Sequence, residues 1–166
     1  AMKMAKPLVI KISNQLKAAG GKQFSPEKIC FDLIEAYWVA ISRIFPEMFH
    51  SSTERDYGIT KSSQSEVMTK VLRYIYDAKD SYWASQKVTF GDPKDPKVWE
   101  KLLKKPLTNF SDQNGDGQKV VGKICWLVGS SGSMGQYTNS AAKRQIAQRL
   151  VEAIEKNIGI TKTRVI

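Results

Sequence analysis

Residue types that commonly build metal sites and nucleophilic centres are scarce in this sequence. Histidine occurs once, at His50, and cysteine occurs twice, at Cys30 and Cys125. Structural zinc sites need clustered Cys and His ligands, and no second histidine or neighbouring cysteine accompanies His50. The sequence around His50 also gives no basis for a Ser/His/Asp catalytic triad. We therefore predict no metal and no cofactor and assign no catalytic residue. Cys30 and Cys125, in apolar surroundings, are expected to be buried, reduced thiols of a cytoplasmic protein.

Long apolar runs are also absent. No run approaches the roughly 20 residues that a helix needs to cross a bilayer, and Lys3, Lys6 and Lys11 interrupt any signal-peptide core. The hydrophobic fraction of 42% and the charged fraction of 25% are typical of a soluble globular protein. We expect one domain over residues 1–166, with no membrane partner, and the chain could be a C-terminal fragment of a longer protein.

Acidic residues are few in comparison with basic ones. Sixteen Asp and Glu oppose 26 Lys and Arg, which leaves a net charge of +10 and a pI of about 9.6. A field of this sign attracts polyanions, and nucleic acid is the commonest polyanion in the cytoplasm. The composition therefore favours nucleic acid as the partner.

Apolar periodicity predicts a mainly α fold, a compact helical domain of about five helices. These are expected at about 8–19, 26–45, 63–76, 96–104 and 140–157, with a small β element near 119–128. The tail, 160–166, alternates like an edge strand, so it either pairs with 119–128 or is the cut end of a longer chain. The helix at 26–45 is apolar over most of its circumference, which predicts that it is buried between other elements.

The predicted core is centred on that helix. Its members are Leu33, Ile34, Tyr37, Trp38 and Ile41, joined by Leu72, Ile75, Trp99, Trp126, Ile146 and Leu150.

The first candidate site follows the apolar run that begins at Val120. A Gly/Ser turn at 129–135 leads from this run into the helix at 140–157. Unpaired N–H groups at a helix start and the positive end of the helix dipole attract phosphate. The predicted phosphate-binding residues are Ser130, Ser131, Gly132, Ser133, Lys143, Arg144 and Arg149. The alternative is that the turn is only a solvent-exposed connector.

Two further basic faces are visible in the helical pattern. A secondary basic patch is predicted on the helix that Asp95 and Pro96 begin, and it consists of Lys97, Lys101, Lys104 and Lys105. The other face interleaves cations with tyrosines, which could hold phosphates and stack bases; it comprises Lys70, Arg73, Lys79, Lys87, Tyr74 and Tyr82. Either face could instead be an ordinary solvated surface.

Residues 25–75 resemble the helical region of DGQHR-domain proteins, which include regulators of DNA phosphorothioate-modification clusters. The resemblance rests on FDLIEAYWVAISRIFPE, at 31–47, and on ITKSS, at 59–63, which fit that family's aromatic helix and its Thr-Lys-Thr/Ser helix start. The DGQHR signature itself is missing, because Asp116-Gly117-Gln118-Lys119 lacks the His and the Arg. The resemblance implies a link to DNA regulation and identifies no functional residue.

These observations predict a non-catalytic nucleic-acid-binding module, with DNA favoured. One alternative is an enzyme that acts on a phosphorylated or nucleic-acid substrate, and another is a protein-interaction domain of a larger assembly. A contiguous basic face would favour the first function, a carboxylate-lined pocket the second, and a large exposed apolar patch the third.

Calcium should leave the melting temperature unchanged. Asp112, Asn114 and Asp116 imitate the first half of a calcium loop, but Lys123 stands at the twelfth position, where a bidentate carboxylate is required. Differential scanning fluorimetry with millimolar calcium checks this expectation, with magnesium as the control. A stabilisation of several degrees by calcium alone would contradict it.

Overall fold

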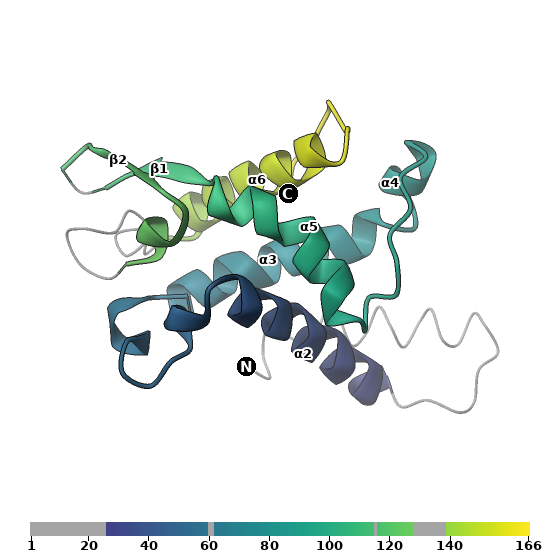
Figure 1. The fold of residues 1–166 in the computed structure, drawn as a ribbon. Coiled ribbons are helices and arrows are strands. Elements are labelled where there is room, and N and C mark those ends of the chain that lie inside the picture. The colour runs from purple at the N-terminus through teal and green to yellow at the C-terminus, as the bar shows by residue number, and fades with distance from the viewer. Residues whose placement is uncertain (1–25, 60–61, 115, 128–138) are drawn as a thin grey trace.

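The computed structural model describes residues 26–59, 62–114, 116–127 and 139–166, and its fold is mainly helical (Figure 1). The helices are α2 (Pro26–Ile44), α3 (Ser62–Ala78), α4 (Tyr82–Ser85), α5 (Pro96–Thr108) and α6 (Ser140–Asn157). Strands β1 (Ser111–Gln113) and β2 (Lys119–Val121) form an antiparallel pair. Short 3-10 turns occupy Pro46–Met48, Glu54–Asp56 and Gly122–Trp126. The predicted fold class is confirmed, while the predicted helix at 8–19 lies outside the described residues.

The helices pack in two connected pairs. Helix α2 packs against α5, α3 packs along α6, and α5 also contacts α6 (Figure 1). Helices α3 and α6 run in the same direction, as two contacts between them show. Near the starts of the two helices Glu66 bonds Lys143, and near their ends Tyr74 bonds Glu155. The Tyr37 hydroxyl donates to the Met68 carbonyl at 3.0 Å and joins α2 to α3.

Aromatic rings connect the helix pairs through the core. Trp99 lies edge-to-face against Tyr37, with ring centroids 5.1 Å apart, and against Phe90 at 4.9 Å. Phe90 contacts Trp83 in turn at 6.0 Å. The indoles of Trp83 and Trp99 are completely buried. Edge-to-face geometry brings the positive ring edge onto a negative ring face, so these contacts stabilise the core beyond the area that they bury.

Most of the predicted core is confirmed. Its members that are buried are Leu33, Tyr37, Ile41, Leu72, Ile75, Trp99, Trp126, Ile146 and Leu150. Ile34 and Trp38 are only partly buried, so their place among the most buried residues is wrong. They lie at the margins of the α2 stripe, where Trp38 packs edge-on against Phe49 and Tyr37. Cys30 and Cys125 are buried and form no disulfide, as expected.

Helix α5 is longer than predicted. Asp95 caps it by accepting the Lys97 N–H at 2.9 Å, as its sequence indicates. The helix then continues past Lys104 through Pro106 to Thr108. A proline in the last turn removes only one helical hydrogen bond there, and its ring is buried in the core. The sequence-based end at Lys104 is therefore wrong.

The extended run predicted from Val120 to Val128 is also shorter than expected. Strand β2 ends at Val121, because Gly122 adopts a φ of 61° and starts a 3-10 turn. Its N–H donates to the Phe110 carbonyl at 2.7 Å, and a Cβ at this position would lie 2.8 Å from the Thr108 carbonyl oxygen. Glycine adopts a positive φ without strain and has no Cβ to clash with this carbonyl, so it meets both requirements of the position.

The tail, 160–166, forms no strand, so its predicted pairing with 119–128 is wrong. Strand β2 pairs with β1 instead, with Asp112 opposite Val120. The tail lies along α6, where the Gln148 side chain donates to the Arg164 carbonyl at 3.1 Å and accepts the Ile166 N–H at 2.8 Å. A side-chain amide thus supplies the two hydrogen bonds that a neighbouring strand would otherwise provide.

Leu33→Ala should lower the free energy of unfolding by about 2–5 kcal/mol, because Leu33 is completely buried and its loss leaves a cavity. Phe31 on the same helix is 65% exposed, so Phe31→Ala is the matched control and should cost less than about 0.5 kcal/mol. Urea unfolding of both variants measures the difference. Equal losses would mean that α2 does not present Leu33 to the core.

Candidate nucleic-acid interface

Part of the first candidate site lies outside the described residues. Ser130, Ser131, Gly132 and Ser133 belong to that part, and their role in binding phosphate stays a prediction. Helix α6 begins directly after it at Ser140, as predicted. Asn139 caps the helix by accepting the Ala142 N–H at 2.8 Å. The three cations predicted for this site, Lys143, Arg144 and Arg149, can therefore be placed.

Lys143 is engaged in an ion pair between helices. Its ammonium lies 2.6 Å from Oε2 of Glu66, and the Lys143 side chain is only 14% exposed. The hydrogen bond from Lys143 lowers the pKa of the Glu66 carboxyl, and Lys70 approaches the other oxygen at 3.5 Å. Lys143 therefore holds α6 against α3, and most of its charge is already neutralised.

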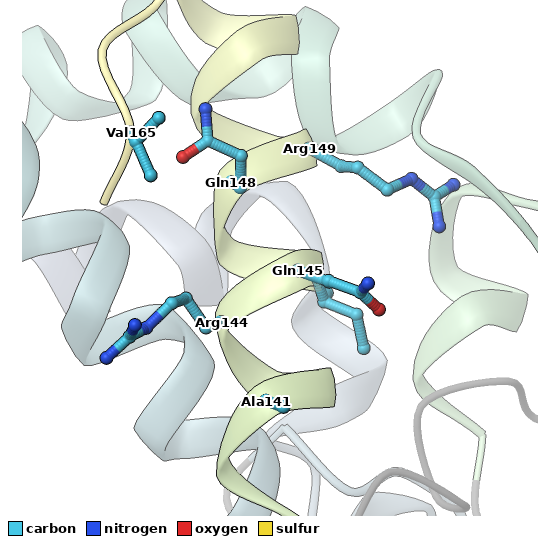
Figure 2. A pocket seen from close by; sticks show the side chains of 7 residues that line it. Ala141, Arg144, Gln145, Gln148, Arg149 and Val165 are labelled. Carbon is cyan, nitrogen blue, oxygen red and sulfur yellow. The ribbon is translucent and has the colours of Figure 1, made fainter.

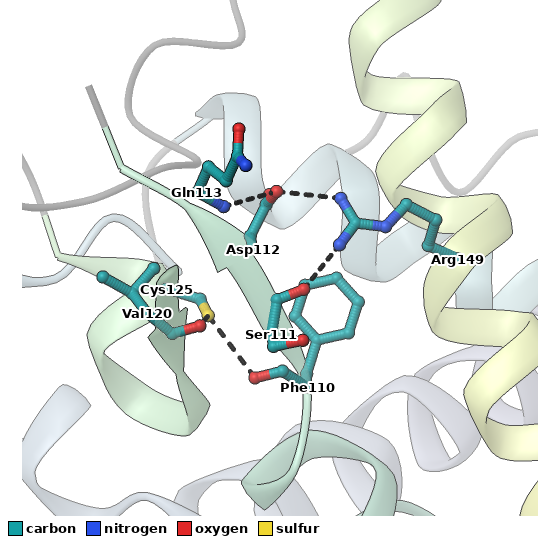
Figure 3. Close-up of polar contacts among 7 residues, drawn as sticks. All are labelled: Phe110, Ser111, Asp112, Gln113, Val120, Cys125 and Arg149. Atoms are coloured by element: carbon teal, nitrogen blue, oxygen red, sulfur yellow. Dashed lines mark hydrogen bonds and ion pairs between the residues drawn. The ribbon is translucent and has the colours of Figure 1, made fainter. Parts of the chain in front are cut away.

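Arg149 is engaged with the β hairpin (Figure 3). Its Nη1 donates to Asp112 Oδ1 at 2.8 Å, and its Nη2 donates to the Ser111 carbonyl. The guanidinium also lies 5.2 Å from the centroid of the Phe110 ring. Asp112 is buried and accepts its neighbouring Gln113 N–H as well. Arg149 therefore ties α6 to β1.

Arg144 leaves α6 on the opposite side from Arg149 (Figure 2). It is exposed and forms no ion pair with any described residue. Between the two arginines, the outer face of α6 forms a hollow of about 650 Å³, lined also by Gln145, Gln148 and Val165. The structure therefore does not bring Lys143, Arg144 and Arg149 to one point, since Lys143 pairs with Glu66, Arg149 pairs with Asp112, and Arg144 extends on the side opposite Arg149.

The polar turn between the strands is closed by its own side chains. Asn114 Oδ1 accepts the N–H groups of Asp116 at 3.1 Å and Gln118 at 2.9 Å. Asp112, the first oxygen donor of the calcium-like pattern, points to Arg149. Across the described ranges, no three His, Cys, Asp or Glu side chains lie close enough together to hold a metal ion. His50 is an exposed loop residue whose Nδ1 lies 2.7 Å from the Ser52 hydroxyl.

The secondary basic patch is intact. Lys97, Lys101, Lys104 and Lys105, here called the lysine ridge, are all exposed on α5. None of the four forms an ion pair with a residue in the described part of the chain. They lie outward because Trp99, Leu102, Leu103, Pro106 and Leu107 form the buried stripe of the same helix.

Many cations elsewhere are paired with carboxylates. Lys28 bonds Asp32 at 3.2 Å, Lys123 bonds Glu47 at 2.8 Å, and Arg43 on α2 lies 3.9 Å from Glu100. Glu100 is the one acidic residue within α5. Because it contacts Arg43 on α2, it does not neutralise the lysines of the ridge. The hydrogen bond from Lys123 also lowers the pKa of Glu47.

The tyrosines of the mixed basic and aromatic face are held by protein groups. The Tyr74 hydroxyl donates to Glu155 Oε1 at 2.9 Å, and the Trp83 indole N–H donates to the same oxygen at 2.7 Å. Burial, followed by the bond to Glu155, raises the pKa of Tyr74. The Arg164 guanidinium lies 4.3 Å from the centroid of the Tyr82 ring. Sequence reasoning missed the buried Glu155, since nothing local distinguishes it from a surface glutamate.

No protein-family model matches the chain, and neither a curated protein nor a solved structure shows significant similarity to it. The resemblance to DGQHR-domain proteins therefore stays a prediction. Of the helices described, none combines the length and the hydropathy that a membrane span requires.

Arg149→Ala should lower the free energy of unfolding by about 1–3 kcal/mol, because it leaves the buried Asp112 carboxylate without its charged donor. Arg144→Ala removes the same group from the same helix at an exposed position and should cost less than about 0.5 kcal/mol. Denaturant unfolding separates the two. Equal stability of both variants would show that the Arg149 contact contributes nothing.

Proposed function

We propose that this protein is a non-catalytic nucleic-acid-binding module that contacts phosphates through its basic helices. The observation that carries the proposal is the lysine ridge of α5, where four exposed ammonium groups face outward without carboxylate partners in the described chain. The net charge of +10 supports it, because the ridge lies in a field that attracts polyanions.

The ridge suits binding that does not depend on base sequence. Lys97 and Lys104 are seven residues apart, which is about 10 Å at roughly 1.5 Å per residue, so the charges follow a line along the helix. Lysine is a compact point charge without the fork that lets arginine read a guanine edge. We therefore expect contacts to the phosphate backbone, which position a protein but specify no sequence.

The aromatic residues favour a duplex over a single strand. Proteins that bind single strands stack bases on exposed rings, whereas Trp83, Trp99 and Trp126 are completely buried here and Phe31 is the one exposed Phe, Tyr or Trp ring among the described residues. Tyr74 and Tyr82, the two rings predicted as a stacking surface, are only partly accessible and are held by Glu155 and the tail. DNA is the expected duplex, as the resemblance to DGQHR-domain proteins implies, and two cysteines outside any disulfide suit a cytoplasmic location.

The scattered exposed apolar residues give less support to a protein-interaction domain. Within the described ranges, the large ones are Phe31, Val121, Ile124 and Val165. Phe31 lies on α2, Val121 and Ile124 lie at the hairpin and the turn after it, and Val165 lies in the tail. Apolar residues that are distributed singly are normal on a monomer surface.

Lys101→Gln combined with Lys104→Gln should weaken binding to all duplex sequences about equally. Each phosphate contact releases about 0.9 counterion from duplex DNA, so the slope of log affinity against log salt should become shallower by up to about 1.8. Fluorescence anisotropy with a labelled duplex between low and physiological salt measures both quantities.

The matched control is Lys119→Gln with Lys156→Gln, which removes the same charge from exposed positions on β2 and α6. If both double variants lose affinity equally, binding follows net charge and the ridge is not the site. If neither the wild type nor any variant binds duplex DNA or RNA, the proposed function is wrong.

A further inference from the structure

A pocket of about 390 Å³ lies between α3, α6 and the end of the tail. Lys70, Arg73, Tyr74 and Asp77 line it from α3, Arg144 lines it from α6, and the last two residues close it. This pocket is distinct from the lysine ridge, since it contains no residue of α5. Arg144, which was predicted to act together with the turn at 129–135, lines this pocket together with Arg73.

Arg73 and Arg144 differ from the other arginines whose side chains are described. Arg43 lies near Glu100, Arg149 bonds Asp112, and Arg164 lies over the Tyr82 ring. Arg73 and Arg144 have no such partner among the described residues, although both line the same pocket. Two uncommitted guanidinium groups beside one cavity are what a bound anion would require.

The surrounding contacts fix the helices and the tail that form the walls of this pocket. The Lys143–Glu66 ion pair fixes α6 to α3 at 2.6 Å close to the starts of both helices. Beyond the pocket, Tyr74 and Trp83 both donate to the buried carboxylate of Glu155. Gln148 holds the tail through the Arg164 carbonyl and the Ile166 N–H, which fixes the third wall. The walls of the pocket are therefore fixed by contacts within the protein, which leaves the two arginine side chains as the groups that must be ordered on binding.

The charges of the lining select the class of anion. Arg73 and Arg144 contribute the two positive charges that would face an anion, because the third cation of the lining, Lys70, already lies 3.5 Å from Glu66 and Asp77 is engaged in an interaction of its own. A phosphate monoester carries about −1.5 to −2 at pH 7, whereas each internal phosphate of a nucleic acid carries −1. The forked guanidinium groups match phosphate oxygens.

We propose that this pocket binds a phosphate monoester dianion. The monoester can be the terminal phosphate of a nucleic-acid strand or the phosphate of a small ester such as a nucleotide. The site stands independently of the proposed function of the lysine ridge, because it is formed by other residues.

The test compares a 5′-phosphorylated duplex with the same duplex ending in a 5′-hydroxyl, and adds adenosine 5′-monophosphate as the small probe. The control for the small probe is adenosine, which lacks the phosphate. The proposal predicts that the wild type binds at least one phosphorylated probe about tenfold more tightly than the same molecule without its phosphate. Arg73→Gln with Arg144→Gln should abolish that preference. Both side chains are exposed, so the melting temperature should not change.

Two further variants separate this site from the ridge. Lys101→Gln with Lys104→Gln should weaken duplex binding but preserve the preference for the phosphate. Arg73→Lys with Arg144→Lys keeps the charge but loses the fork, so it should retain only part of the preference. This second variant also serves as the test if the glutamine variant fails to fold.

The outcomes are distinguishable. A preference for the phosphorylated duplex end identifies a nucleic-acid terminus as the source, and binding of the mononucleotide alone identifies a small ester; both support the pocket. Suppose that no duplex binds, that the wild type binds the mononucleotide, and that the Arg73→Gln, Arg144→Gln variant does not. The proposed function is then wrong and the pocket proposal is supported. If the wild type prefers no phosphorylated probe, or if the Arg73→Gln, Arg144→Gln variant keeps the full preference, the pocket proposal is overturned.

Discussion

The burial of Trp99 is the constraint on which the arrangement of the molecule depends. Its indole is completely buried, contacts Tyr37 and Phe90 edge-to-face, and donates from Nε1 to the Pro93 carbonyl at 2.7 Å. A helix with one side fixed by such a large residue cannot rotate about its axis without exposing it. Helix α5 therefore has one orientation, in which its lysines face solvent. The same core contact thus stabilises the fold and determines the charged surface.

In a chain of charge +10, repulsion among the cations destabilises the folded state, and carboxylate partners reduce it. Those between packed elements are neutralised across long sequence distances, Lys143 by Glu66 and Arg149 by Asp112. Among the cations outside these pairs, two groups form surfaces of different geometry. The lysine ridge is a line of point charges, and the pocket beside Arg73 and Arg144 is concave and carries guanidinium groups.

The sequence predicted what local periodicity and capping determine. The bounds of α6 and the start of α5 at Asp95 were correct, because caps and apolar stripes are local signals. It failed where distant residues decide the structure. Arg149 pairs with a carboxylate 37 positions away and Lys143 with one 77 away, so no spacing within α6 could show that they are engaged. Apolar and polar residues alternate in the tail as they do in a strand, but the Gln148 side chain, and not a neighbouring strand, forms hydrogen bonds with its backbone.

The central claim is that the lysine ridge of α5 contacts nucleic acid, and amine-reactivity footprinting tests it most directly. The protein would be acylated briefly with and without saturating duplex DNA, and each modified lysine would be quantified by mass spectrometry. The account predicts that the duplex protects Lys97, Lys101, Lys104 and Lys105, while the exposed Lys119 and Lys156 react at the same rate in both samples. Unchanged reactivity of the ridge, with protection at Lys119 or Lys156 instead, would contradict it.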